Sequence, residues 1–276
     1  MTVVGVVGPG YMGAGLGGAL RTGGARVVTT LAGRSDRSRR LAGAAGLEVL
    51  PALEDVLAAA DVVLSVVPPG QAVATARALA AAMPGGARPL VADLNAVAPG
   101  TMREIAGILG EVVDGSISGP PPSATPGARI YLCGDRAAEI AGLPWDGQVD
   151  PIVVAGEVGT ASALKMCTAS VYKGLTALVT QAMRAAGHYG VLDEVLADLA
   201  KAGLDNSASV PRAATKAHRF VDEMREIAAA QAGAGLTPAL FEAMAEVYAD
   251  VATTRLAQGD PETTGSLPPA ETIARL

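Results

Sequence analysis

The fold is decided by the stretch VVGVVGPGYMGAGLGGAL, residues 3–20. Residues 3–7 are apolar or glycine throughout, which is typical of a strand covered on both faces. Glycine and proline follow at residues 8–10 and indicate a turn, and residues 14–20 favour a helix. The order of strand, glycine loop and helix predicts the opening unit of a parallel βαβ sheet.

The same alternation continues through the first half of the chain. Further strands are predicted at residues 25–30, 62–67, 90–94, 112–117 and 130–132, separated by alanine-rich stretches. Beyond residue 156 the β-branched runs end, and helix-forming residues with apolar stripes take over. We therefore predict an α/β fold: an N-terminal Rossmann domain with a doubly wound, mostly parallel sheet in residues 1–156, and a C-terminal all-α domain in residues 157–276.

Composition limits the possible partners. With 276 residues, half of them apolar, the chain is long enough for two cores, and its net charge of -6 argues against a nucleic acid. Cys133 and Cys167 are far apart, so neither a disulfide framework nor a metal site is expected. The N-terminus has no basic flank and no cleavage signature. We expect a cytoplasmic protein that does not enter a membrane.

The loop GPGYMG at residues 8–13 has the G-x-G-x-x-G spacing. Gly8 suits a tight turn, Gly10 lets a pyrophosphate approach the backbone, and Gly13 allows close packing of helix on strand. The helix N-terminus then offers N–H groups and a partial positive charge to phosphates. We predict a nicotinamide dinucleotide site made by Gly8, Pro9, Gly10, Tyr11, Met12 and Gly13.

The end of the second predicted strand indicates which nucleotide is bound. An acid there recognises the ribose of NAD, whereas an arginine accommodates the 2′-phosphate of NADP. No acid ends this strand, and Gly33, Arg34 and Ser35 follow it. NADP is therefore favoured over NAD. In the alternative interpretation the arginines of residues 34–40 belong to a solvated helix start capped by Asp36, the one residue that would restore NAD use.

These segments resemble the β-hydroxyacid dehydrogenase superfamily, which includes 3-hydroxyisobutyrate dehydrogenase, 6-phosphogluconate dehydrogenase and the imine reductases. The resemblance lies in GVVGPGYMG at residues 5–13, GRS at 33–35, SVVPP at 65–69 and DLNA at 93–96. It implies that Val67, Pro68 and Asn95 belong to the cofactor site.

Two further segments resemble the substrate and catalytic motifs of that superfamily. DGSISGP at residues 114–120 is similar to Asp-x-x-x-Ser-Gly-Gly, which implies that Ser118 and Gly119 hold the substrate's polar end. GTASALKM at residues 159–166 is similar to the start of the helix with the catalytic lysine, which makes Lys165 the proton donor. The alternatives are a proline-rich turn for the first segment and an ordinary surface lysine for the second.

Other residues of the predicted long helix bear on the chemistry. Tyr172 shares a helical stripe with Lys165 and is a backup proton donor, with core packing as the alternative. Cys167 is expected to be buried beside the lysine. The sequence departs from the resemblance at Ala169, where the dehydrogenases carry an asparagine, at Thr168, where the 6-phosphogluconate enzyme uses a histidine, and at Glu223, where some members carry a lysine.

The resulting prediction is an NADP-dependent oxidoreductase acting on a small β-hydroxyacid or carbonyl compound. The alternatives are an imine reductase on the same scaffold and a non-catalytic NADP-binding sensor or scaffold. The apolar stripe of Phe220, Met224, Ile227 and Ala228, together with the resemblance, predicts a homodimer or tetramer.

Overall fold

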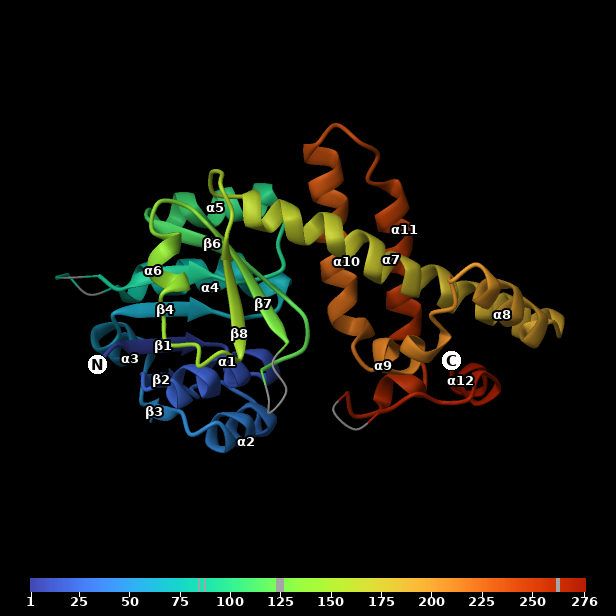
Figure 1. Ribbon diagram of the computed structural model, residues 1–276, viewed down its shortest axis with the longest axis horizontal. Coiled ribbons are helices and arrows are strands. Elements are labelled where there is room, and N and C mark those ends of the chain that lie inside the picture. Colours follow the sequence, from blue (N-terminus) through green and yellow to red (C-terminus); the bar gives the residue numbers. More distant parts are fainter. Residues whose placement is uncertain (84, 87, 123–126, 262–263) are drawn as a thin grey trace. The chain divides into compact units, whose positions relative to one another are not determined.

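The computed structural model of the protein describes residues 1–276 except 84, 87, 123–126 and 262–263 (Figure 1). The chain divides into two compact units, Met1–Lys165 and Met166–Leu276. The division falls inside one long helix, α7 (Thr160–Tyr189). The domain boundary predicted at residue 156 precedes this helix and stays a prediction.

The first unit is built on an eight-stranded sheet with the order β3-β2-β1-β4-β5-β6-β7-β8. Neighbours from β3 through β6 are parallel, and β7 is antiparallel to β6. The predicted α/β fold is thus confirmed. The strands are β1 (Val3–Val7), β2 (Arg26–Thr30), β3 (Glu48–Leu50), β4 (Val62–Ser65), β5 (Leu90–Asp93), β6 (Val112–Ser118), β7 (Ala128–Cys133) and β8 (Val149–Val153).

Strands β3 and β8 were not predicted, and both lie at an edge of the sheet. The first has only three residues, and two of them are exposed. The second contains Pro151, which lacks a backbone N–H and is tolerated where one side of a strand is unpaired. Edge strands need no continuous apolar run, so the pattern that identified the inner strands is missing from them.

Helices cover both faces of the sheet, as Figure 1 shows. Val4 and Val6 of β1 join the core under α1, α2 and α6, whereas Val7 joins the core under α3, α4 and α5. Successive strand residues point to opposite faces, so both sets must be apolar. Each large side chain fully buried there contributes about 1.5–3 kcal/mol. The helices are α1 (Tyr11–Thr22), α2 (Asp36–Ala44), α3 (Leu53–Ala59), α4 (Ala72–Ala82), α5 (Pro99–Leu109) and α6 (Ala137–Ala141).

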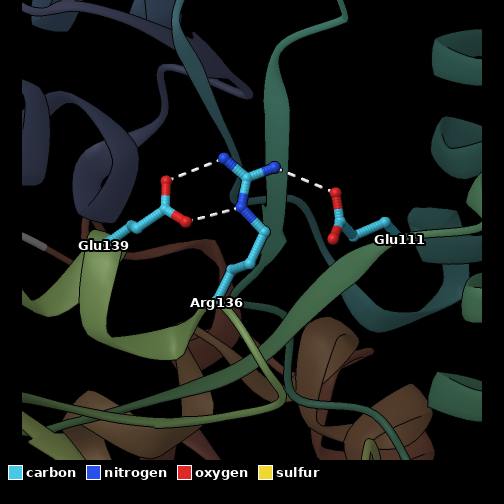
Figure 2. A network of polar contacts seen from close by, with 3 residues as sticks. All are labelled: Glu111, Arg136 and Glu139. Carbon is cyan, nitrogen blue, oxygen red and sulfur yellow. Dashed lines mark hydrogen bonds and ion pairs between the residues drawn. The ribbon is translucent and has the colours of Figure 1, made fainter.

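An ion-pair network lies at the amino end of β6. Arg136 donates to both carboxylate oxygens of Glu139, at 2.5 and 2.7 Å, and to Glu111 at 2.9 Å (Figure 2). It connects the start of α6 to the turn before β6. Because all three side chains are partly exposed, the network contributes modestly to stability.

The sheet reverses its direction of growth between β1 and β4. The chain adds β2 and β3 on one side of β1 and then places β4 on the other. The register pairs Val7 with Ser65, so these two strands end side by side. Doubly wound sheets bind ligands outside the carboxyl ends of the strands at such a reversal.

The second unit is helical. Met224 and Ile227 of α10 are fully buried within this chain, and Phe220 makes an edge-to-face contact with Tyr248 of α11 at 5.2 Å. The apolar stripe predicted for a subunit interface is thus largely covered in the monomer, and the oligomeric state stays a prediction. Besides α7, the helices are α8 (Leu192–Lys201), α9 (Val210–Ala214), α10 (Ala217–Gly233), α11 (Ala239–Val251) and α12 (Pro269–Arg275). None of the helices in the described parts of the chain could cross a membrane.

Candidate active site

The glycine loop after β1 is shaped by two steric requirements. Gly8 has a φ of +91°, and a Cβ there would lie 2.3 Å from the carbonyl oxygen of Val66 in the loop after β4. A Cβ on Gly13 would lie 2.3 Å from the carbonyl oxygen of Gly8. A Cβ on Gly10, chain neighbours aside, would have no atom of the described residues within 4 Å. Packing therefore requires the first and third glycines, whereas Gly10 borders open space.

The head of α1 follows this loop directly. Gly10 is the N-cap, and the first helical hydrogen bond runs from the Ala14 N–H to the Gly10 carbonyl at 2.8 Å. Among the described residues no side chain caps this end. Pro9 is buried and Tyr11 is 42% exposed. The N–H groups of the first turn, together with the helix dipole, are thus available to an anion.

Beside this loop, β2 ends at the residues predicted to select the nucleotide. Gly33 has a φ of +68°, Arg34 is half-buried, and Ser35 is the N-cap of α2. The Ser35 hydroxyl oxygen accepts the Ser38 N–H at 3.3 Å, and the hydroxyl groups of the two serines also lie within hydrogen-bond distance, at 3.3 Å. Asp36 lies in the first turn with its side chain exposed, so it is not the cap that the alternative interpretation expected. The role of Arg34 at the nucleotide stays a prediction.

A buried polar network fixes the loop after β4. The Asn95 amide oxygen accepts the Val67 N–H at 2.6 Å, and its amide nitrogen donates to Ser65 at 3.0 Å and to Asp93 at 2.8 Å. All three side chains are at most 2% exposed. The Asn95 amide is committed to these partners, so this residue positions Val67 and the following Pro68.

The carboxyl group of Asp93, at this edge of the sheet, has a strongly shifted pKa. Burial raises its pKa to about 7, against the opposing effect of hydrogen bonds from Asn95 and Ser65, and the nearby Asp114 charge raises it further. The carboxyl group therefore changes protonation near neutral pH. In the sequence, an acidic residue at the end of an otherwise apolar strand is the feature that indicates such a buried carboxyl group.

Asp114 of β6 anchors the head of α7. Its side chain is fully buried, and one oxygen accepts the N–H groups of Gly159, Ala161 and Ser162 at 2.8, 3.0 and 3.2 Å. The other oxygen accepts the Ser162 hydroxyl at 2.6 Å. The Cys133 thiol donates to the same carboxylate, and burial raises its pKa to about 11. A carboxylate from a distant strand thus satisfies the unpaired donors of this helix.

Two more contacts fix the next turns of α7 on β6. The Ser116 hydroxyl donates to the Ala161 carbonyl at 2.9 Å, and the Lys165 ammonium donates to the Ile117 carbonyl at 2.7 Å. Burial lowers the pKa of Lys165 below its usual 10.5. The ammonium group is half-buried against the strand end, which contradicts the surface-lysine alternative.

The predicted substrate pair follows at once. Ser118 is the last residue of β6 and directly follows the carbonyl bonded by Lys165, so the three predicted residues Ser118, Gly119 and Lys165 come together. Gly119 has a φ of +103°, and a Cβ there would lie 2.3 Å from the Gly127 carbonyl oxygen. The turn itself therefore needs this glycine, whether or not a substrate binds there.

Two expectations about α7 are wrong. Cys167 is exposed because two residues rotate a helix by about 200°, which turns it away from the side of Lys165. Tyr172 is 71% exposed and not packed in a core, and it belongs to the helical unit. Its predicted role as a proton donor is not tested by these contacts. Throughout the described ranges, no three His, Cys, Asp or Glu side chains are grouped to hold a metal ion.

Two known sequence families match separate parts of the chain. Residues 3–87 match the family described as NADP oxidoreductase, coenzyme F420-dependent, and residues 186–251 match a domain of unknown function, DUF1932. No curated protein matches at a significant level.

Solved structures match nearly the whole chain. The conserved protein MTH1747, described as structurally similar to 3-hydroxyacid dehydrogenases, is 28% identical with a TM-score of 0.66, over 91% of this chain and 96% of that one. The 3-hydroxyisobutyrate dehydrogenase of Mycobacterium tuberculosis, solved with L-serine, is 20% identical with a TM-score of 0.68, over 99% and 98%. A reductive aminase from Aspergillus terreus, in complex with NADPH and ethyl levulinate, is 16% identical with a TM-score of 0.61, over 99% of each. The last two likenesses show the fold alone.

The sheet, its reversal point and the glycine loop define a doubly wound α/β protein, and the part that contains the loop matches an oxidoreductase family. Both family matches and the similar solved structures support the resemblance of this chain to the β-hydroxyacid dehydrogenase superfamily.

Proposed function

We propose that the chain is an NADP-dependent oxidoreductase that transfers a hydride between the nicotinamide and a small β-hydroxyacid or carbonyl compound. The observation that carries this proposal is the glycine loop. Gly8 and Gly13 are packed against backbone oxygens, whereas the space next to Gly10 is open at the head of α1. The matched family description, which names NADP, supports the choice of nucleotide.

The residues present fit such a nucleotide. The loop at residues 8–13 would hold the pyrophosphate, and Arg34 with Ser35 would hold the 2′-phosphate through charge-assisted hydrogen bonds. Val67 and Pro68, held in place by Asn95, would line the nicotinamide side. When bound, the nucleotide supplies or accepts the hydride.

Lys165 handles the proton. Reduction of a carbonyl needs a proton at the developing alkoxide oxygen, and Lys165 Nζ donates it. Its lowered pKa brings the group closer to the pH at which it can both donate and accept a proton. The Ile117 carbonyl holds the ammonium group beside Ser118 and Gly119, which bind the polar end of the substrate.

Two alternatives each have an observation in their favour. The likeness to a reductive aminase favours an imine reductase on the same scaffold, but Lys165 at the proton-donor position favours hydroxyacid chemistry. The buried Ala169 offers no amide to orient a substrate, which favours a non-catalytic NADP-binding sensor.

We also propose that the protein is a homodimer in the cytoplasm. Val171 and Leu178 on α7 are 65% and 57% exposed and suit a subunit contact.

The nucleotide site is tested by Gly10→Ala. The extra methyl group meets no atom of the described residues, so the fold is preserved while the approach of a pyrophosphate is blocked. We expect NADPH affinity, measured by titration calorimetry, to fall at least about tenfold, a loss of about 1.4 kcal/mol. Unfolding of the first unit, followed by fluorescence of the only tryptophan, Trp145, should not change.

Gly107→Ala is the matched control, because this glycine also has open space but lies on α5. Equal NADPH affinity in the wild type and Gly10→Ala would refute the proposed nucleotide site.

A further inference from the structure

A cavity of about 410 Å³ lies within the helical unit. All its lining residues belong to that unit, and they come from α7, the segment 208–213, the start of α10 and Ser266. Three of them are cations, Lys173, Arg212 and Lys216, and none of the described lining residues is acidic. This concentration of positive charge occurs in a chain with a net charge of -6. A cavity lined by one sign of charge attracts ligands of the opposite sign.

Three contacts fix the position of Lys173 at the cavity. Its ammonium group is paired with the largely buried Glu223 and lies 4.7 Å from the centroid of the Phe220 ring. Its backbone carbonyl accepts the Tyr248 hydroxyl at 2.8 Å. The charge of Lys173 is thus balanced by Glu223, and its position is set by packing.

The other two cations of the lining are Arg212 and Lys216. Arg212 projects from α9 with an exposed side chain, and Lys216 is half-buried at the start of α10. Arg212 forms no ion pair with any carboxylate of the described residues. A guanidinium group recognises the paired oxygens of a carboxylate or phosphate through two parallel hydrogen bonds.

The remaining lining suits an organic molecule. The Tyr172 ring is 71% exposed there, and Phe220 adds a second aromatic face. Ser209 and Ser266 contribute hydroxyl groups. The Thr176 hydroxyl is already committed, because it donates to the Tyr172 carbonyl at 3.0 Å and accepts from Asn206. A volume of about 410 Å³ is in the range of small-molecule pockets and exceeds what a bare inorganic anion fills.

We propose that this cavity is a binding site for a small organic oxyanion, a carboxylate or a phosphate monoester. The charged end binds Arg212 and Lys216, and the carbon body lies against Tyr172 and Phe220. The inference is independent of the proposed function, because the lining lies wholly in the helical unit and binding is measured without nucleotide.

The test is titration calorimetry on the full chain with four probes: succinate, glycerol 3-phosphate, glycerol as the neutral control and inorganic phosphate as the bare anion. We expect one organic anion to bind and glycerol not to bind; the tighter of the two anions identifies the charged group. Arg212→Gln and Lys216→Gln should each weaken that binding about tenfold, as the loss of a charge-assisted hydrogen bond implies. Higher salt should weaken it as well.

Arg225→Gln is the matched control, because Arg225 lies on α10 outside the cavity lining. It should leave affinity unchanged, and circular dichroism checks that each variant is folded. If Lys216→Gln does not fold, the anion affinity of Arg212→Gln alone decides whether the cations of the cavity bind the anion. Failure of both organic anions to bind, binding of inorganic phosphate alone, or an equal loss in Arg225→Gln would overturn the proposal. NADPH affinity, titrated separately in Arg212→Gln, reports on the proposed function and is expected to be unchanged.

Discussion

The two units of this protein use polar side chains in opposite ways. In the α/β unit, Asp93, Asn95 and Asp114 are buried, and their hydrogen bonds hold loops and a helix in place. In the helical unit, Arg212 and Tyr172 are exposed around an open cavity. No buried side-chain polar atom of the described residues lacks a partner. Buried networks determine geometry because every unmade bond is costly, whereas exposed charges select what binds.

The largest effect is expected from breaking the anchor of α7. Asp114→Ala leaves the buried N–H groups of Gly159 and Ser162 without this acceptor, and the Ala161 N–H keeps only the Cys133 sulfur at 3.4 Å. The free energy of unfolding of the first unit should fall by about 3–5 kcal/mol. Urea unfolding followed by Trp145 fluorescence measures it. Asp150→Ala, on the exposed edge strand, should change little; similar losses in both variants would contradict the anchoring role.

The next effect concerns Lys165, the proposed proton donor on the helix that Asp114 anchors. Lys165→Ala should lower kcat/KM for carbonyl reduction by about 10²–10⁴-fold and leave NADPH affinity unchanged. In the wild type the rate of reduction should fall as the pH rises through the lowered pKa of Lys165, below 10.5. Lys201→Ala, at the exposed end of α8, is the control. A variant at position 165 with full rate would show that another group supplies the proton.

A smaller effect is expected from titration of the buried carboxyl group. The pKa of Asp93 is raised from 3.8 to about 7 in the folded protein, so the folded state holds a proton that the unfolded state has lost. Stability should therefore decrease as the pH rises, by about 2–3 kcal/mol between pH 5 and 7. Asp93→Asn should flatten this dependence in urea unfolding followed by Trp145, whereas Asp150→Asn should not. An unchanged slope in the first variant would argue against the raised pKa.

The smallest effect distinguishes the two nucleotides. Arg34→Ala removes the guanidinium group proposed to meet the 2′-phosphate, so NADPH affinity should fall about tenfold while NADH affinity stays the same. Arg40→Ala, which removes the same charge from the neighbouring helix α2, should affect neither. Titration calorimetry with both nucleotides measures this; an equal fall for NADPH and NADH would contradict the preference for NADP.

The sequence alone was enough to predict the features that depend on residues close together in the chain, namely the inner strands and the glycine loop. Continuous apolar runs identified the inner strands, because both faces of each are buried. The spacing of Gly8, Gly10 and Gly13 identified the loop after β1, in which Gly8 and Gly13 leave no room for a side chain. The edge strands β3 and β8 were not predicted, because strands that are partly exposed lack a continuous apolar run.

Only the tertiary structure decided which distant groups meet. Asp114 reaches the head of α7 from a strand that ends more than 40 residues earlier, and Asn95 fixes a loop 28 residues before it. The exposure of Cys167 and the cationic cavity likewise depend on how helices pack. The partner of a buried polar group is set by long-range contacts, and these leave no periodic trace along the chain.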